Sequence, residues 1–325
     1  MNYIQQAYKG RNEWYHWVIT IIIIFFGWQI LGAIPLLMAA AAKSKDLNQF
    51  SEFAKDNFMT AGIDKNLLLA LLIFTFFVGF ISLLIGVKYV HKRTITSLVT
   101  SRKKIDWKRF FFGFFVWGMI AVVFSYVGIL SEPEHYTWNF NAKPFFILVA
   151  ISFLFIPFQT SFEELLFRGY FMQGIGILAK NRWIPLLITS VVFGLLHGAN
   201  PEVAKLGQIT MVFYIGTGLF YGITTLMDEG AEIALGLHAV NNITAAFFIT
   251  TDWSVFQTDA LYIDTSEPSV TWEMFLPVFV LYPLMLFIFS KKYGWQNWKE
   301  KLTGKITEPI NLKENYRVLE NIGTE

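Results

Sequence analysis

Long apolar stretches, separated by shorter polar ones, run along most of the chain. Windows of about 19 residues identify transmembrane helices in such a pattern. The windows that qualify are residues 18–41, 67–90, 110–130, 144–178, 184–198, 206–227, 232–250 and 275–290. Most of them have about the number of apolar residues that a helix needs to cross the roughly 30 Å hydrocarbon core of a bilayer. The pattern therefore predicts an all-α fold: a polytopic integral membrane helical bundle with about eight transmembrane helices, in contact with the lipid bilayer.

Two of these windows have unusual lengths. Residues 144–178 would form a helix of about 50 Å at about 1.5 Å per residue, which is longer than the bilayer core. We expect this helix to kink at Pro157 or to project beyond the membrane. Residues 184–198 are barely long enough to cross, so we expect neighbouring helices to shelter their ends.

Lys and Arg are concentrated in alternate connections between the windows. Residues 91–109 and the tail after residue 290 are rich in them, whereas the loop 251–274 contains none. Positively charged connections stay on the cytoplasmic side, so both termini are predicted to be cytoplasmic. The first apolar run is longer than that of a signal peptide, and we interpret it as an uncleaved helix.

Composition narrows the functional classes. With 54% hydrophobic and 15% charged residues, the chain does not have the composition of an ordinary soluble enzyme. The absence of cysteine excludes disulfides, thiolate metal ligands and a cysteine nucleophile. The net charge of +2 is small, and no basic patch interleaved with aromatic residues indicates a nucleic acid partner. Any catalysis must therefore use oxygen and nitrogen groups.

The second half of the chain places such groups inside the apolar windows. They are Glu163, Glu164 and Arg168 in the fourth window, His197 in the fifth, and His238 and Asn242 in the seventh. An ionised side chain at the bilayer centre costs about 2.5–3.5 kcal/mol on insertion scales, so such residues are functional candidates by default.

Helical spacing restricts how these side chains can meet. Glu164 and Arg168 are four residues apart and can form an ion pair on one helix. Glu163 points about 100° away from Glu164, and we expect it to face a polar cavity as a free carboxylate. His238 and Asn242 also share one face of their helix. Phe193 lies one turn before His197, where it can wall the cavity and fix the imidazole.

This set of groups is suited to two kinds of chemistry. Glu163 can accept a proton from water while a histidine relays it, and Asn242 with the second histidine can donate hydrogen bonds to an oxyanion. Alternatively, His197 and His238 can bind zinc together with a glutamate, although the helical H-E-x-x-H pair of many zinc peptidases is absent. The residues leave a zinc-dependent and a metal-free mechanism equally open.

Three motifs occur in order along the chain. They read EExxxR from Glu163 to Arg168, FxxxH from Phe193 to His197, and HxxxN from His238 to Asn242. This arrangement resembles the CPBP family of intramembrane proteases, also called the Abi family, which includes CAAX prenyl endopeptidases and bacteriocin-processing or self-immunity proteins.

The resemblance implies an intramembrane endopeptidase. It implies that Glu163 is the general base and that His197 helps to activate the water. His238 and Asn242 would stabilise the oxyanion or, in a metalloprotease, His238 would be a ligand. Glu164 and Arg168 would be supporting residues, as Phe193 would be in packing. The substrate would be a peptide or protein, with a prenylated C-terminus or a bacteriocin-like leader among the options.

The resemblance also divides the chain. Residues 1–143 are predicted to be an N-terminal region of three transmembrane helices that surrounds the core in this lineage. Residues 144–250 would form the catalytic core, and residues 251–325 an outer loop, the last transmembrane helix and a cytoplasmic tail.

Two other classes of function use the same buried charges. A transporter or channel could carry protons or ions along them. Transporters commonly show repeated, broken helices in both halves, whereas here the buried charges lie only in the second half. A catalytically idle immunity or scaffold protein that binds a peptide is the other alternative.

Overall fold

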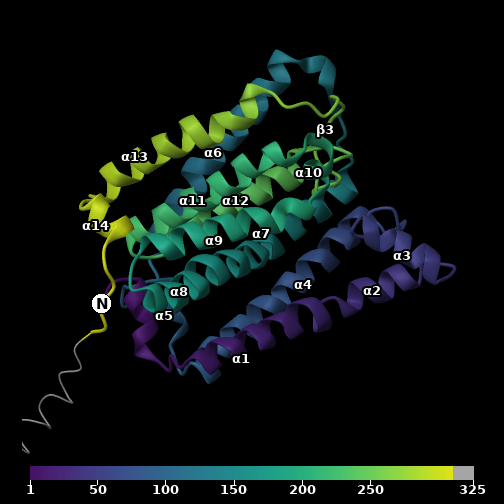
Figure 1. The fold of residues 1–325 in the computed structure, drawn as a ribbon. Coiled ribbons are helices and arrows are strands. Elements are labelled where there is room, and N and C mark those ends of the chain that lie inside the picture. Colours follow the sequence, from purple (N-terminus) through teal and green to yellow (C-terminus); the bar gives the residue numbers. More distant parts are fainter. Residues whose placement is uncertain (310–325) are drawn as a thin grey trace, which may run out of the picture.

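The computed structural model describes residues 1–309 of the chain. Helices lie side by side along one common direction and form a bundle (Figure 1). The first half of the chain contributes α1 (Trp14–Phe25), α2 (Ile34–Ala41), α3 (Leu47–Lys55), α4 (Lys65–Ile85), α5 (Ile95–Val99) and α6 (Trp107–Ser131). The second half contributes α7 (Ala142–Glu164), α8 (Met172–Ala179), α9 (Trp183–Leu196), α10 (Pro201–Leu206), α11 (Met211–Asp228), α12 (Glu232–Phe247), α13 (Tyr282–Tyr293) and α14 (Trp298–Thr303).

Six helical stretches in the described part of the chain are long and apolar enough to cross a membrane. They are Trp14–Ala41, Lys65–Val90, Trp107–Ser131, Ala142–Ala179, Gln208–Asp228 and Trp272–Tyr293. The other two predicted windows form shorter helices, α9 with the turn after it and the 16-residue α12. The predicted polytopic helical bundle is thus confirmed, and the protein is a multi-pass membrane protein.

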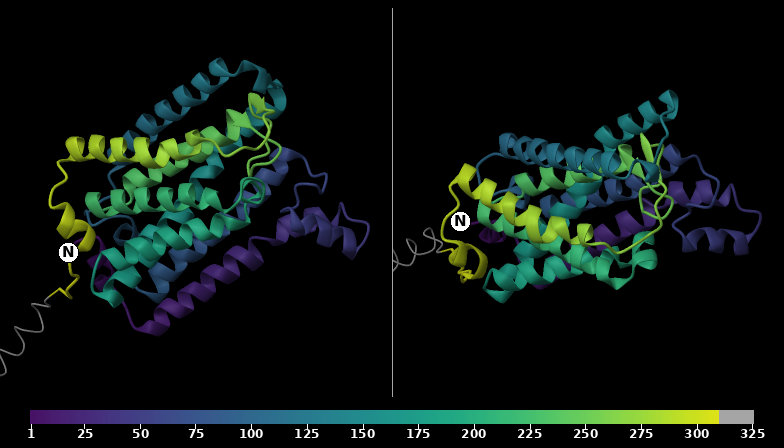
Figure 2. Two further views of the ribbon diagram at one scale, coloured as in Figure 1. Left: turned by 45° about the horizontal axis from the view of Figure 1, so that its top comes forward. Right: turned by 90° about the horizontal axis from the view of Figure 1, so that it is seen from above.

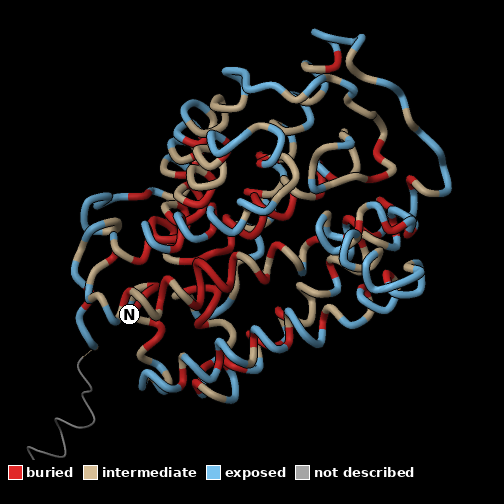
Figure 3. The backbone as a smooth tube through the Cα atoms, turned by 45° about the vertical axis from the view of Figure 1, so that its right-hand side comes forward, coloured by how far each residue is buried: buried red, intermediate tan, exposed pale blue. Residues whose placement is uncertain are grey.

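Helix α12 lies in the interior of the bundle. It packs between α6 and α7, while α9 packs on α11 and α4 on α7. Residues 231–240 are all buried, and Figure 3 shows buried positions gathered on the inner helices, with exposed positions along the outer ones. Because neighbouring helices surround α12, it can be short and carry polar groups without exposing them to lipid.

The long fourth helix continues without a break from Ala142 to Ala179. Pro157 lies inside α7, and the departure from α-helical geometry comes later, in a π-helical segment at Leu165–Phe171. Such segments frequently occur at functional sites. The C-terminal end of this helix, α8, is covered by the N-terminal 3-10 helix Ile4–Lys9, so its extra length is packed against protein.

The two ends of the described chain lie at the same end of the bundle, as the two views of Figure 2 also show. Gln5 Nε2 donates a hydrogen bond to the carbonyl of Thr307 over 2.8 Å. At the opposite end, a small sheet has the order β1 (Tyr136–Trp138), β3 (Tyr262–Asp264), β2 (Ile249–Thr250). The pair β1 and β3 is antiparallel, and β2 and β3 are parallel. The sequence pattern did not predict these strands.

Candidate active site

The predicted residues come from three neighbouring parts of the bundle (Figure 1). Glu163 and Glu164 end α7, and Arg168 lies in the π-helical segment that follows. His197 directly follows α9, and His238 and Asn242 lie on α12. The site is therefore held by packed helices, not by loops, which favours a fixed geometry.

Glu164 forms a fully buried ion pair with Arg168, as the spacing predicted. Arg168 Nη1 lies 3.1 Å from Glu164 Oε1, and both side chains are completely buried. Arg168 also donates from Nη2 to the carbonyl of Gly218 over 3.0 Å, and its guanidinium lies 4.3 Å from the ring centroid of Phe193. These contacts tie α7 to α9 and α11, so the pair has a structural role.

Glu164 has a second partner that the sequence did not reveal. His238 Nδ1 lies 2.9 Å from the same oxygen, Oε1. Because a carboxylate accepts hydrogen bonds, this contact places a proton on Nδ1, so the neutral form of the imidazole has its lone pair on Nε2. The ring of Tyr221 stacks on His238, with centroids 5.2 Å apart. Glu164 thus fixes both the tautomer and the orientation of His238.

Glu163 lies beside the other nitrogen of His238. Its Oε2 is 3.7 Å from His238 Nε2, too far for a direct hydrogen bond. Its Oε1 accepts a hydrogen bond of 2.8 Å from Gln159 Nε2. The side chain of Glu163 is 13% exposed, in contrast to Glu164, which is completely buried. Within residues 1–309, no group donates a hydrogen bond to Glu163 Oε2. Of the two glutamates, only Glu163 has a partly exposed side chain, although its unpaired oxygen Oε2 is buried.

Asn242 reaches Glu163 through Gln159. Asn242 Nδ2 donates to Gln159 Oε1 over 3.3 Å, and the opposite end of the Gln159 amide holds Glu163. The neighbouring Asn241 turns towards α6 and accepts a hydrogen bond from Trp117 Nε1. Gln159 was not among the predicted residues, although it lies four residues before Glu163 and therefore on the same face of α7.

His197 lies against the wall of the site. Its Nδ1 is 2.7 Å from the carbonyl oxygen of Phe193, and its ring lies between Phe193 and Tyr214, with centroids 4.6 Å and 4.5 Å away. No hydrogen bond or ion pair within residues 1–309 joins it to Glu163 or His238. The ring of Phe193 connects the two histidines, since its centroid also lies 6.0 Å from that of His238.

Three polar residues beside His197 carry no signal in the sequence: Tyr214, Glu202 and Asn200. Tyr214 on α11 donates a hydrogen bond to Glu202, and Asn200 Nδ2 bonds both of them at 3.2 Å. Glu202 also accepts from the backbone N–H of Val255 in the loop after α12. No spacing within one helix indicates these contacts, because they join three separate segments.

The zinc alternative can be compared with this geometry. In His238, Nδ1 is bonded to a carboxylate, and in His197 it is bonded to a carbonyl oxygen; within the described part of the chain, Nε2 is free in both. Metal-ligating histidines usually show this arrangement. However, residues 1–309 contain no group of three or more His, Asp or Glu side chains close enough to share a metal ion. The contacts bring together Glu163 and His238, whereas a catalytic zinc takes a third protein ligand. As placed, the residues do not fit such a site.

Comparison with known proteins agrees with the motifs. A model of the family described as Type II CAAX prenyl endopeptidase Rce1-like matches residues 142–244. The chain carries a CPBP-family domain. This domain runs from the start of α7 through most of α12 and contains all seven predicted residues. The match supports a membrane protease of the CAAX family as the class of function.

The similarity to a relative extends beyond the CPBP domain. The chain is 29% identical to "Uncharacterized protein YyaK" of Bacillus subtilis (strain 168) over 281 residues. The matched region covers 86% of this chain and 93% of that protein. The matched length is more than the CPBP domain can supply, so helices outside it are shared with this relative. No solved structure matches the chain.

Proposed function

We propose that the protein is an intramembrane endopeptidase in which Glu163 activates the attacking water. The observation that carries this proposal is the pair formed by Glu163 Oε2 and His238 Nε2, 3.7 Å apart. With Nδ1 of His238 bonded to Glu164, both facing atoms are hydrogen-bond acceptors. A water molecule that lies to one side of the line between these two atoms can donate one hydrogen bond to each of them. That arrangement orients a water lone pair for attack.

The reaction then follows general base chemistry. The water oxygen attacks the carbonyl carbon of the peptide bond, and Glu163 takes its proton. The C–N bond breaks, and Glu163 returns the proton to the leaving amine. Gln159 holds Glu163 in place, and Asn242, which is bonded to Gln159, would donate its second amide hydrogen to the oxyanion. His197, fixed by Phe193 and Tyr214, would face the substrate from the α9 side.

Reconstituted protein tests this function directly. Membrane peptides with prenylated and unmodified C-termini, and bacteriocin-like leader peptides, are incubated with it and analysed by mass spectrometry. We expect wild type to cleave at least one class and Glu163→Gln to lose 10²-fold or more of the rate, about the lower limit of general base contributions. Glu232→Gln makes the same substitution at another buried glutamate, outside the site, and should retain cleavage.

The same preparation separates the alternatives. Zinc in stoichiometric amount, lost together with activity on chelation, would establish the metalloenzyme, and full activity without metal supports the glutamate mechanism. Ion flux that depends on Glu163, without cleavage of any peptide, would establish a transporter. If wild type and Glu163→Gln bind the peptides or confer immunity equally well, and neither cleaves a peptide, the protein is an immunity or scaffold protein.

We also propose that the end of the bundle that carries Met1 and Thr307 faces the cytoplasm. Tyr3 at this end bonds through its hydroxyl to the carbonyl of Leu98, so the basic segment 91–109 lies at the same end. Because the chain has no cysteine, single introduced cysteines report the orientation. In intact cells, an impermeant thiol reagent should label Asn48→Cys on α3 but not Thr307→Cys; the reverse result would invert the topology.

A further inference from the structure

A polar pocket of about 280 Å³ lies at the end of the bundle that holds the two ends of the described chain. Three apolar spans begin or end around it: α6 starts at Trp107, α11 ends at Asp228 and α13 ends at Tyr293. The tryptophans Trp107 and Trp298 are exposed at this end, as is usual where a protein meets the headgroups of a bilayer. The pocket is therefore at the level of the membrane surface and apart from the catalytic residues.

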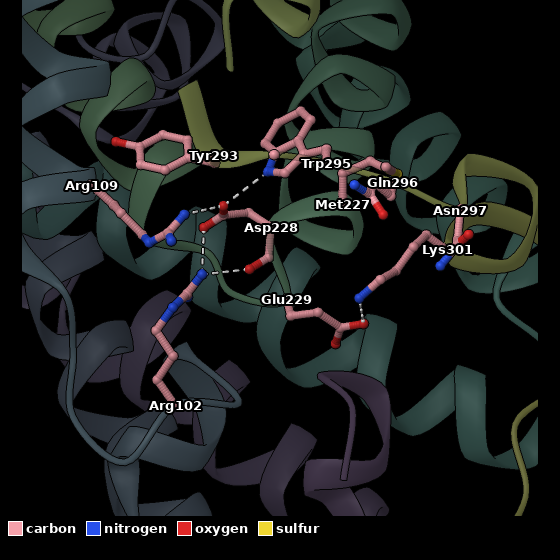
Figure 4. A pocket seen from close by; sticks show the side chains of 11 residues that line it. Arg102, Arg109, Met227, Asp228, Glu229, Tyr293, Trp295, Gln296, Asn297 and Lys301 are labelled. Carbon is pink, nitrogen blue, oxygen red and sulfur yellow. Dashed lines mark hydrogen bonds and ion pairs between the residues drawn. The ribbon is translucent and has the colours of Figure 1, made fainter. Parts of the chain in front are cut away.

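The acidic groups in the pocket are already paired (Figure 4). Asp228 accepts hydrogen bonds from Arg102 and Arg109 and from Trp295 Nε1 at 3.0 Å. Glu229 is bonded by Lys301 Nζ at 2.5 Å, by Arg182 at 3.2 Å and by the backbone N–H of Tyr3. With their oxygens bonded in this way, Asp228 and Glu229 offer little to a cation.

The remaining hydrogen-bonding capacity is on the donor side. Arg109 uses Nε towards Asp106 and Nη1 towards Asp228. Within residues 1–309, the Nζ of Lys301 is bonded only to Glu229, so both side chains retain donors. Gln296, Asn297 and the hydroxyl of Tyr293 also line the pocket, and within residues 1–309 no side-chain hydrogen bond occupies them. Convergent cationic and neutral donors are what a multi-oxygen anion requires.

The charge of the surrounding surface has the same sign. Exposed lysines that form no ion pair within the described chain adjoin the pocket residues in sequence: Lys103, Lys104, Lys108, Lys291, Lys292 and Lys299. Such clusters attract phosphate-bearing anionic headgroups.

We propose that this pocket binds an anionic phosphate group at the membrane surface. The group is carried by a lipid headgroup or is free in solution, and the chemistry of recognition is the same for both. Arg109 and Lys301 supply the charge, and Gln296, Asn297 and Tyr293 supply hydrogen bonds that select the oxygens of a phosphate. Nothing in the catalytic mechanism uses these residues.

Thermal unfolding of the purified full-length protein in phosphate-free buffer tests the proposal. One arm adds phosphatidylglycerol, or phosphatidylcholine whose choline cancels the phosphate charge. The other arm adds sodium phosphate, or sodium chloride at equal ionic strength. We expect phosphatidylglycerol to raise Tm by several degrees and phosphatidylcholine to leave it unchanged.

Two variants locate the effect. Gln296→Ala with Asn297→Gly removes two neutral donors, and glycine suits the left-handed backbone at position 297 (φ 56°). Lys301→Gln removes one charge but leaves Glu229 bonded to Arg182. Each should need at least tenfold more ligand for the same shift, whereas Asn48→Ala at the far end should match wild type.

The outcomes separate the sources. Stabilisation by phosphatidylglycerol alone assigns the pocket to lipid, and stabilisation by sodium phosphate as well assigns it to the free anion. The proposal is overturned if neither ligand acts, or if both pocket variants respond like wild type.

Discussion

The protein buries carboxylates in two places, and the two clusters differ in how fully their oxygens are bonded. At the end of the bundle, Asp228 and Glu229 are surrounded by cations, and Glu232 accepts from Arg102 at 3.1 Å and from the backbone N–H of Asp106 at 3.2 Å. At membrane depth, Glu163 and Glu164 each have one oxygen without a hydrogen-bond donor in the described chain.

The difference distinguishes structural from chemical use of a buried charge. A buried polar atom without a partner costs about 1–3 kcal/mol, and more when charged. Complete pairing at the end of the bundle avoids that cost. At membrane depth, the unpaired oxygen of Glu163 lies in the one part of the molecule where the CPBP motifs meet, and proteins commonly retain unfavourable local arrangements at functional sites.

The largest expected effect on stability comes from Glu164. Glu164→Ala leaves Arg168 buried without its carboxylate and removes the partner of His238, so we expect a loss of about 3–5 kcal/mol in the free energy of unfolding. Glu163→Gln should change it by less than about 1 kcal/mol, since Gln159 remains within reach. Chemical denaturation in lipid–detergent mixtures measures both, and equal losses would remove the distinction between the two glutamates.

His91 extends the comparison to a buried group that is fully bonded. Its Nδ1 is 2.7 Å from the carbonyl oxygen of Arg11 and its Nε2 2.9 Å from the hydroxyl of Tyr170. Burial lowers the pKa of His91 from its ordinary 6.5 to about 4. The unfolded chain therefore binds more protons between these values, and stability falls as the pH drops from 6.5 towards 4, by about 3 kcal/mol in total.

The measurement is the dependence of unfolding free energy on pH for wild type and His91→Gln. The variant lacks the titrating group, so its profile should be flatter between pH 6.5 and 4. Parallel profiles would mean that His91 binds protons equally in the folded and unfolded states.

A substitution at Glu232 tests the cluster of Asp228, Glu229 and Glu232, in which the carboxylates are bonded to cations. In Glu232→Gln, Arg102 keeps Asp228 as a charged partner, so we expect a loss of about 1–3 kcal/mol in stability. Cleavage per folded molecule should stay within twofold of wild type. A large loss of activity at unchanged stability would show that this end of the bundle takes part in catalysis.

The smallest effect is expected at Gln159. Gln159→Ala removes the hydrogen bond that orients Glu163 and the link to Asn242. We predict about tenfold slower turnover at unchanged substrate affinity, equivalent to about 1.4 kcal/mol, and little change in stability. Gln159→Glu, of the same size, should be slower still because it places a second carboxylate beside Glu163.

The sequence predicted what depends on a single helix. All eight apolar windows are helices, because hydrophobicity over such a length is required by the bilayer. The contact between Glu164 and Arg168 follows from the 3.6-residue helical repeat. The strands β1 to β3 were missed since each is only two or three residues long, and the π-helical segment after Glu164 has no clear sequence signal.

What depends on two helices could not be predicted from spacing. The packing of α12 against α7 brings His238 to both glutamates, whereas the spacing predicted only Arg168 as a partner of Glu164. The same limit explains why His197 was expected beside Glu163 and instead lies between Phe193 and Tyr214. Residues from separate helices were grouped in advance by their shared depth in the apolar windows and by the resemblance to the CPBP family.

The central claim is that Glu163 is the base for peptide hydrolysis. The most direct test is the single-turnover cleavage rate, per folded molecule, of wild type and Glu163→Gln in identical proteoliposomes. We predict a loss of 10²-fold or more with unchanged stability. Equal rates for the two proteins would contradict it.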